Sequence, residues 1–455
     1  MGLICGCPPT GCSGRSAARP AAEPDRLTSF RRSSAIVTRR EFAISALAAV
    51  GGVATLSSCT SGTGAESYET AIQNTWRHSK GEPGGQSALL RELVRYATLA
   101  PSSHNTQCWR FRIEDAAISI LPDLSRRCPV VDPDDHHLFV SLGCSAENLI
   151  QAALANGRMG HAAFYTAGGN ALRVSLESTH AVTSALFQAI PERQSTRAEY
   201  DGKPLARQEL ELLERAGTGS GVRLIFLTER EAMERVLEYV VQGNTTQMND
   251  RAFVEELKTW IRFSANEAIR TGDGLYSASS GNPSLPPWLG NLLFDLFFTP
   301  KNENDRYAKY VRSSAGIAVF VADDAGPAHW IEVGRSYERF ALQSAALGIR
   351  NAFLNQPVEV AALRPQFAGF LGVGNRRPDL VVRFGRGPKL PPSLLDRRRL
   401  VKDMAWSRVL SVGVEEIDED HRKLVAIFNI LNHAVIDRES PEYMAAVLDE
   451  LNPSS

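Results

Sequence analysis

Apolar side chains recur every three or four residues between Gln86 and Leu99, which predicts an amphipathic helix with one buried face. The Ala100-Pro101 step that follows ends this helix, because proline lacks the amide hydrogen that a helix needs. The same spacing predicts three further helices, at Leu138–Asn156, Gln208–Ala216 and Trp330–Leu347. Gly157 after the first and Gly348 after the last are typical of helix C-caps.

Short apolar runs, rich in β-branched and aromatic residues, predict strands between these helices. They lie at Cys108–Ile113, Val222–Leu227, Gly316–Ala322 and Leu380–Phe384. Helix and strand therefore alternate in the same outline twice along one chain, which suggests an internal duplication. The pattern predicts an α+β fold whose halves cover residues 85–189 and 190–400.

The charge balance changes little in this picture. Lys and Arg total 50 against 51 Asp and Glu, so the net charge of −1 gives no reason to expect a nucleic-acid partner. The seven cysteines are too few and too scattered for a disulfide framework. Cys5 and Cys7 lack the second pair of ligands that a zinc site needs, and we expect no metal there.

Residues 1–60 are expected to be a disordered leader, followed by a linker at 61–84. Arg39-Arg40 precedes a mildly apolar run, Phe42–Leu56, and the pair resembles a twin-arginine export signal. Leu56-Ser57-Ser58-Cys59 resembles a lipobox, which implies a lipidated Cys59 and an exported, periplasmic or membrane-anchored lipoprotein. The alternative is a chance arginine pair before a buried helix in a cytoplasmic protein, and a start codon near Val37 would give a leader of ordinary length.

Two motifs carry a resemblance to a known family. The segment Ala100–Trp109 resembles the A-P-S-x-x-N-x-Q-P-W segment of the nitroreductase family, with Cys108 in place of the proline. The segment Arg193–Arg197 resembles the R-x-S-x-R motif of the same fold, and a Lys-Pro pair follows it as in that family. Together with the leader and the duplicated layout, residues 85–400 look most similar to the Acg-type branch of nitroreductases.

The resemblance implies an FMN cofactor and a set of residues that hold it. Arginines that flank a serine grip a phosphate well, because guanidinium groups make charge-assisted forked hydrogen bonds. By resemblance the cofactor-binding residues are Arg193, Gln194, Ser195, Arg197, Pro101, Ser102, Ser103, Asn105, Gln107, Asn355, Gln356, Gly385 and Arg386. The plain alternatives are a solvated arginine-rich surface turn and an ordinary Ser-His-Asn loop.

The distribution of the motifs predicts one FMN for each chain. The first half has the Pro101–Asn105 turn but only Trp76–Ser79 where the arginine motif would be. The second half has Arg193–Arg197, but glycine-rich Ala216–Gly221 follows its first helix. One flavin site can thus be completed between the halves of an intramolecular pseudo-dimer, so a second subunit is not required. The aromatic stretch 275–305 is a candidate lid, with a surface-packed insertion as the alternative.

The expected reaction is the passage of a hydride from NAD(P)H through FMN to a small electron-poor acceptor such as a nitro compound or quinone. The alternative is a lidded protein that binds or sequesters FMN with little turnover. No side chain stands out in the sequence as a catalytic nucleophile or proton donor, and His104 in the turn is more typical of a plain hydrogen-bonding residue.

Residues 404–455 resemble the opening of a bacteriohemerythrin, a four-helix bundle with a di-iron site. His421 matches the first iron ligand of that family, but the H-F-x-x-E-E segment expected soon after Leu451 is missing. A single histidine cannot hold two irons. We therefore expect an incomplete helical-bundle fragment and no functional di-iron oxygen-binding module.

Overall fold

The computed structural model describes residues 67–395, apart from 80, 82, 167 and 168, together with residues 403 and 404. The predicted leader with Cys59, and the hemerythrin-like segment with His421, lie outside the described residues except for Met404. Within the stretch expected to be a linker, the helix α2 (Tyr68–Thr75) forms because Tyr68 and Ala71 are buried in a small apolar cluster with Tyr276 and Leu394.

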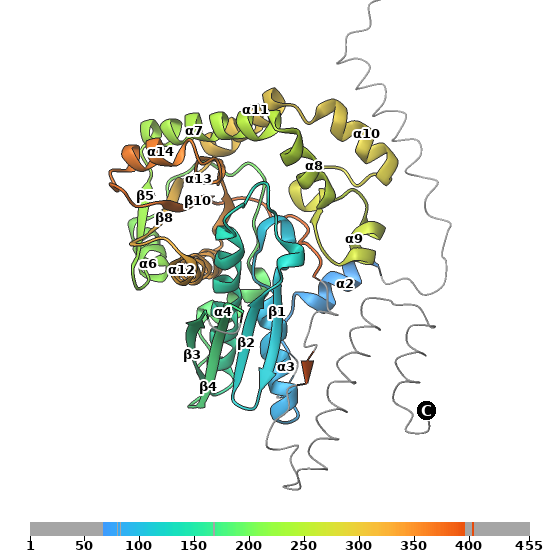
Figure 1. Ribbon diagram of the computed structural model, residues 1–455, viewed down its shortest axis with the longest axis vertical. Helices are drawn as coiled ribbons and strands as arrows, with labels where there is room; N and C mark the ends of the chain where they lie inside the picture. The colour runs from blue at the N-terminus through green and yellow to red at the C-terminus, as the bar shows by residue number, and fades with distance from the viewer. Residues whose placement is uncertain (1–66, 80, 82, 167–168, 396–402, 405–455) are drawn as a thin grey trace, which may run out of the picture. The chain divides into compact units, whose positions relative to one another are not determined.

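The first half is built on one sheet (Figure 1). One helix precedes its strands, one lies between its second and third strands, and a short one follows them. Its elements are α3 (Gln86–Thr98), β1 (Trp109–Glu114), β2 (Ala117–Pro122), α4 (His136–Ala155), β3 (Arg158–Tyr165), β4 (Ala171–Ser178) and α5 (Ala185–Ala189). The strand order is β11-β1-β2-β4-β3, where β11 (Asp403–Met404) adds in parallel and the other neighbours are antiparallel.

The second half repeats this order of elements around a second sheet. It contains α6 (Arg207–Gly217), β5 (Val222–Leu227), β8 (Gly316–Ala322), α12 (Pro327–Ala346), β9 (Arg350–Phe353), α13 (Gln356–Glu359), α14 (Arg364–Leu371) and β10 (Pro378–Gly385). Its antiparallel order β5-β8-β10-β9 corresponds strand for strand to β1-β2-β4-β3 of the first sheet. The mixed helix-and-sheet architecture confirms the α+β expectation.

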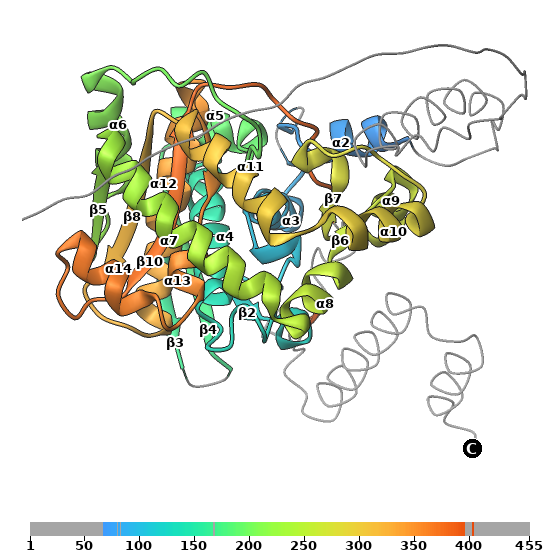
Figure 2. The same cartoon turned by 90° about the horizontal axis from the view of Figure 1, so that it is seen from above.

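A long insertion separates β5 from β8, where the first half has a tight hairpin. It consists of α7 (Arg230–Asn249), α8 (Arg251–Thr259), β6 (Ile261–Arg262), α9 (Ala265–Thr271), β7 (Leu275–Tyr276), α10 (Pro287–Phe297) and α11 (Pro300–Arg312). In Figures 1 and 2 the insertion lies over one end of α4. The expected lid at 275–305 is therefore one part of a larger helical insertion that the apolar pattern did not predict.

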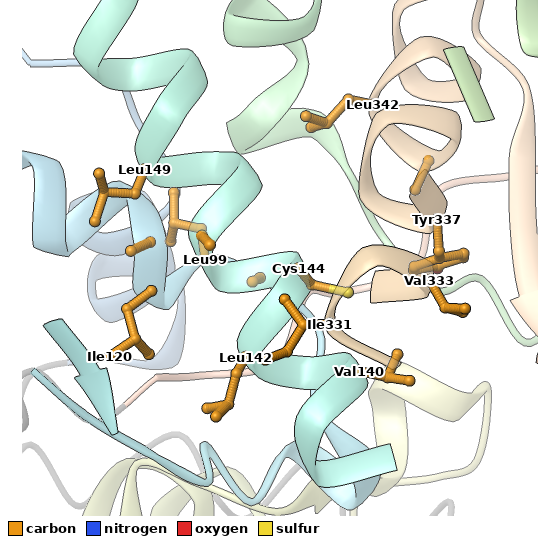
Figure 3. Close-up of a cluster of buried hydrophobic side chains, with 14 of the residues drawn as sticks. Leu99, Ile120, Val140, Leu142, Cys144, Leu149, Ile331, Val333, Tyr337 and Leu342 are labelled. Atoms are coloured by element: carbon orange, nitrogen blue, oxygen red, sulfur yellow. The ribbon is translucent and has the colours of Figure 1, made fainter. Parts of the chain in front are cut away.

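The helices α4 and α12 cross at the centre of the main apolar core, in which Val140, Cys144, Ile331 and Tyr337 gather (Figure 3). Each helix has 20 residues, and the eighth residue of each is a glycine, Gly143 in α4 and Gly334 in α12. A Cβ on Gly143 would lie 2.0 Å from the Ile331 carbonyl oxygen, and a Cβ on Gly334 would lie 2.0 Å from the Val140 carbonyl oxygen. The two contacts are reciprocal, as are those that a two-fold axis generates in an isologous interface.

Among the described residues, α4 is also the one helix with the length and mean hydropathy, 1.3, of a membrane span. However, 78% of its apolar 18-residue window is buried inside the fold, so its apolar character is explained by its place between the two halves.

Candidate functional site

Two adjoining cavities, of about 190 and 250 Å³, lie where the two halves and the insertion meet. The first is lined by the turn after α3, one face of α4, the segment 193–197, the residues around Asn355, and residues 391–395. The second is lined mainly by the insertion and by β9, α13 and β10. Both include His104, Val131, Arg197, Leu275, Phe353, Asn355 and Glu359, so together they offer one continuous space of the size that small-molecule sites have.

The turn that follows α3 has an unusual backbone. His104, Asn105 and Gln107 have φ angles of 48°, 54° and 53°, in the left-handed region that residues other than glycine rarely adopt. Such conformations persist where surrounding contacts hold them, and they are frequent at binding sites. Ser102 contributes to this, because its Oγ accepts a hydrogen bond from the Gln107 backbone N–H at 2.9 Å.

Side-chain amides tie this turn to distant parts of the chain. Asn105 Nδ2 donates to the carbonyl oxygens of Gly274 at 3.1 Å and Leu394 at 2.9 Å. Gln107 Nε2 donates to the Gly272 carbonyl oxygen at 2.9 Å. These two amides therefore position the turn, while Pro101, Ser102, Ser103 and Asn105 all line the first cavity. Gln107 does not line it and is completely buried.

Arg193 lines the first cavity, but its guanidinium already has partners inside the protein. Arg193 Nη2 donates to the Leu99 carbonyl oxygen at 3.0 Å, and its Nε lies 3.2 Å from Glu338 Oε1. The Nε contact is an ion pair without hydrogen-bond geometry. Burial raises the pKa of Glu338 to about 7, against the opposing effect of the Arg193 charge. This buried arrangement makes Arg193 a link between the cavity wall and α12.

Ser195 and Arg197 differ from Arg193 in lacking such partners. Ser195 Oγ is buried and makes no hydrogen bond. In the part of the chain that the structure describes, the Arg197 guanidinium makes neither a hydrogen bond nor an ion pair, although it lines both cavities. Burial lowers the pKa of Arg197, while the hydroxyls of Tyr307 and Tyr310 oppose this shift. An arginine remains charged under these conditions, so Arg197 presents an unpaired cation to the cavity.

The segment that follows β10 closes the first cavity. Gln194 fixes it with two hydrogen bonds, since its Nε2 donates to the Leu390 carbonyl oxygen at 2.5 Å and its Oε1 accepts from the Leu390 N–H at 3.1 Å. Trp76 Nε1 donates to the Ser393 carbonyl oxygen at 2.9 Å. Gln194 thus acts on the cavity both by lining it and by holding its wall.

Asn355 and Gln356 lie at the start of α13, where both line the second cavity. Asn355 Oδ1 accepts from the Val381 N–H at 3.0 Å, which fixes the amide so that Nδ2 lies 3.3 Å from His137 Nε2. Within the described residues no acceptor is found for the backbone N–H of Asn355 or of Gln356, and Gln356 Oε1 is buried without a partner. These are the polar groups that a bound molecule could satisfy.

The end of β10 differs from the sequence-based expectation. Arg386 lines neither cavity, because its guanidinium pairs with Glu209 and donates to the Leu347 carbonyl oxygen at 3.1 Å. Gly385 is needed for a close approach, since a Cβ there would lie 2.9 Å from the Tyr200 ring. Neither residue is therefore placed to touch a molecule in the cavities.

Arg383, which the sequence analysis missed, lines the second cavity instead. Its guanidinium lies 4.0 Å from the Tyr200 ring centroid and donates to the carbonyl oxygens of Thr196 at 3.1 Å and Ala198 at 2.7 Å. Arg383 therefore supports the backbone between Ser195 and Tyr200 from behind. The signal available in the sequence was an arginine inside an otherwise apolar strand, where a charge must have a structural or binding role.

His137, Asp132 and Glu359 were not predicted from the sequence either. His137 and Glu359 both line the first cavity, and His137 Nδ1 lies 3.6 Å from Asp132 Oδ1. Asp132 caps α4, because its two oxygens accept the N–H groups of His137 and Leu138 at 3.0 Å each. His104 differs from His137, since burial and the nearby charge of Arg197 lower the pKa of His104 to about 4 and leave it neutral.

No family model matches the chain. Two curated relatives from two strains of Mycobacterium tuberculosis, whose names describe them provisionally as NAD(P)H nitroreductases, are each 24% identical to it over 340 residues. The alignment covers 70% of this chain and 92% of each relative. The chain is similar to nitroreductases.

Two solved structures are similar to parts of this chain. A nitroreductase with bound FMN from Desulfitobacterium hafniense is 14% identical, with a TM-score of 0.32, over 50% of this chain and 100% of that one. The NADPH:FMN oxidoreductase of Vibrio harveyi, solved with NAD⁺, is 12% identical, with a TM-score of 0.29, over 59% and 97% of the two chains.

Proposed function

We propose that this protein is a nitroreductase-type flavoprotein that binds one FMN in the two adjoining cavities. The observation that carries the proposal is the pairing of an unpartnered hydroxyl and an unpaired cation, Ser195 and Arg197, in a cavity that also contains the Pro101–Asn105 turn. The sequence relatives named as NAD(P)H nitroreductases, and the resemblance of both motifs, support the same assignment.

The donor set fits a phosphate. A buried cation without a counter-ion is costly unless a ligand supplies the negative charge, and a phosphate supplies that charge together with strong acceptor oxygens. Arg197 and Ser195 would bind the phosphate of FMN. Arg193 and Gln194 would instead fix the surrounding backbone, through hydrogen bonds to the carbonyl oxygens of Leu99 and Leu390. The free N–H groups of Asn355 and Gln356 would face the polar edge of the ring system.

The duplicated architecture supports one site for each chain, formed within an intramolecular pseudo-dimer. The place equivalent to the Pro101–Asn105 turn is Thr218–Gly221, which follows α6. A Cβ on Gly219 would lie 2.2 Å from Ser336 Oγ, so this turn packs directly against α12 and leaves no room for a ring. We infer that the second site of a symmetric flavin dimer has been filled by the protein itself.

When bound, FMN supplies two-electron chemistry, accepting a hydride from NAD(P)H and reducing a nitro, quinone or similar acceptor. The residues of this chain bind the cofactor, exclude water and position its partners. The insertion lines the second cavity with Tyr307, Tyr310 and Phe298, which is the support for its role as a lid. The second candidate function is FMN sequestration with little turnover, and this enclosure by the insertion favours it.

A paired substitution tests the cofactor site. Arg197→Met should weaken FMN binding at least tenfold, because a hydrogen bond to a charged group contributes about 1.5–3 kcal/mol. Arg386→Met is the matched control, since Arg386 pairs with Glu209 outside the cavities and its loss should leave FMN affinity unchanged. Affinity is measured from the visible flavin absorbance during titration of the apoprotein. A purified wild-type chain that takes up no FMN, or an Arg197→Met chain that binds it as tightly as the wild type, would overturn the proposal.

Steady-state oxidation of NADH and NADPH by the yellow protein, with a panel of nitro compounds and quinones, separates the two candidate functions. Turnover with any acceptor supports the reductase, and full FMN occupancy without turnover supports sequestration.

The predictions for the ends of the chain, export with lipidation at Cys59 and an incomplete hemerythrin-like fragment around His421, stay predictions. Mass analysis of the mature protein and its iron content test them.

A further inference from the structure

His137 is a buried titratable group on the wall of the first cavity. It lies in the first turn of α4 and shares one face of that helix with Val140, Ser141 and Cys144, all of which line the cavity. Only 6% of the residue is exposed, so its surroundings and not bulk water set its charge.

The groups around His137 come from every element packed against it. Burial disfavours the charged imidazolium, Asp132 before α4 and Glu359 of α13 favour it, and Arg377 before β10 opposes it. Asp379 of β10 also interacts with His137, although burial raises the pKa of Asp379 to about 6. The neighbouring His136 ring, whose centroid is 4.6 Å away, is neutral because burial lowers its pKa well below the usual value. His104 from the turn is neutral as well. The two carboxylates prevail, so the pKa of His137 is raised although burial alone would lower it.

The hydrogen-bond geometry gives the two charge states of His137 different partners. In the neutral state with the proton on Nδ1, Nε2 can accept from Asn355 Nδ2 at 3.3 Å. In the charged state Nε2 becomes a donor and faces another donor, because the Val381 N–H holds Asn355 Oδ1 and fixes the orientation of the amide. The Nε2–H of the imidazolium then lacks an acceptor among the described residues, and an acceptor in the cavity can provide one.

We propose that His137, oriented by Asp132, is a charged positioning residue of the cavity that makes the bound flavin easier to reduce at and below neutral pH. This inference rests on the proposed function. The physical reason is that reduction adds negative charge to the cofactor, and a fixed cation in a water-poor cavity stabilises that charge more than water would. A histidine gives this effect a pH dependence that an arginine could not give.

The test is the reduction equilibrium of bound FMN in the wild type and in His137→Gln, measured by dye-coupled titration at about pH 6 and about pH 9. Glutamine keeps a donor near Nε2 but carries no charge. At about pH 6 the variant should be at least tenfold harder to reduce, which is about 30 mV for a two-electron couple. At about pH 9 the difference should shrink, because His137 loses its proton as the pH rises through its pKa.

His136→Gln is the matched control, since His136 is the adjacent residue, is equally buried and pairs with Asp379 at 3.0 Å without lining either cavity. It should leave the potential unchanged. Asp132→Asn covers the case in which His137→Gln does not fold. It keeps an acceptor for the helix cap but removes the charge that favours the imidazolium, so it should match the wild type at low pH and be harder to reduce near neutral pH.

Equal potentials in the wild type and His137→Gln at both pH values, with FMN bound to both, would overturn this inference and leave the proposed function intact. A shift of equal size in His136→Gln would also overturn it, because the effect would then be structural. A wild-type chain that binds no FMN would overturn the proposed function and this inference together.

Discussion

The turn after α3 and the turn after α6 occupy equivalent places in the two halves, but their backbones differ in conformation and in what they contact. Residues 101–107 adopt left-handed conformations at three positions without glycine, and residues 101–105 line the first cavity. Residues 218–221 include Gly219 and Gly221, pack against α12 and line neither cavity. The difference shows that equivalent turns in the two halves do not both line a cavity, because the second turn packs closely against α12.

The central helices keep their symmetry more closely than the turns do. Besides Gly143 and Gly334, they share a buried glutamate as the twelfth residue, Glu147 in α4 and Glu338 in α12. Glu147 lies 3.0 Å from Arg339 and 3.3 Å from Arg335, both on α12, whereas Glu338 pairs with Arg193 of the cavity wall. Of these two glutamates, only Glu338 therefore contacts a residue that lines the cavity.

The largest expected effect concerns the helix crossing itself. Gly334→Ala should destabilise the protein by about 3 kcal/mol or more, because the new Cβ would overlap the Val140 carbonyl oxygen and rigid backbone cannot move aside cheaply. Gly369→Ala in α14 is the control, since nothing lies within 4 Å of its Cβ position, and it should be neutral or stabilise by about 0.5–1 kcal/mol. Denaturant unfolding of both variants measures the contrast. Equal stability of the two would refute the close crossing.

The two buried glutamates should differ in how stability depends on pH. The pKa of Glu338 is raised from 4.5 to about 7, so the folded state holds its proton more tightly than the unfolded state does. The associated stability is present below about pH 4.5 and is lost as the pH rises to about 7. Between about pH 5 and pH 8 the wild type should therefore lose on the order of 2 kcal/mol relative to Glu338→Gln, whose side chain does not titrate.

Glu147→Gln is the comparison for that experiment. Two arginines face Glu147, and its replacement should destabilise the protein without the gain at high pH expected for Glu338→Gln. Unfolding free energies of the three proteins at both pH values decide the matter. A difference between wild type and Glu338→Gln that does not change with pH would show that Glu338 is ionised throughout.

The sequence predicted those parts of the fold that local patterns determine. The helices α3, α4, α6 and α12 and the strands β5 and β8 were expected within a few residues of their observed bounds. The strands β3 and β4 were missed. In β3 half-buried residues such as Gly160 alternate with exposed ones such as His161, without a clear apolar face. In β4 the apolar face is limited to Leu172, Val174 and Leu176 among polar neighbours. The amphipathic insertion helices α7 and α11 were missed as well.

The site shows the same limit. The motifs led to Ser195, Arg197 and the turn, which the structure brings into one cavity. The engagement of Arg193 with Glu338 and of Arg386 with Glu209 joins residues more than a hundred positions apart, and a motif carries no information on such partners. His137 was missed for the same reason, since its significance depends on the cavity that α4 helps to form.

A smaller effect is expected where the turn of the first half meets the insertion of the second. Asn105→Gly keeps the left-handed backbone, which glycine adopts without strain, and removes the hydrogen bonds to Gly274 and Leu394. We expect a loss of about 1–2 kcal/mol, since each hydrogen bond contributes about 1 kcal/mol. Faster amide hydrogen exchange should be confined to residues 101–107, 272–275 and 391–395. Exchange that increases equally in 218–221 would contradict a local bridge.

The smallest expected effect concerns the outer edge of the insertion, which has no counterpart in the first half. Lys258 of α8 lies 2.8 Å from Asp295 Oδ1 of α10 and 5.6 Å from the Phe294 ring centroid. Because Asp295 is 62% exposed, solvent screens this ion pair, and Asp295→Asn should cost less than about 1 kcal/mol of global stability. Its effect should fall instead on the release of FMN, measured by the loss of bound flavin after dilution, which should quicken if α10 acts as a lid.

Lys301→Met is the control, because the exposed Lys301–Asp305 pair lies within α11 alone and holds no second helix. Unchanged release in Asp295→Asn would indicate that the insertion is a fixed wall, and the asymmetry between the halves would then lie in the turns and the cavity residues alone.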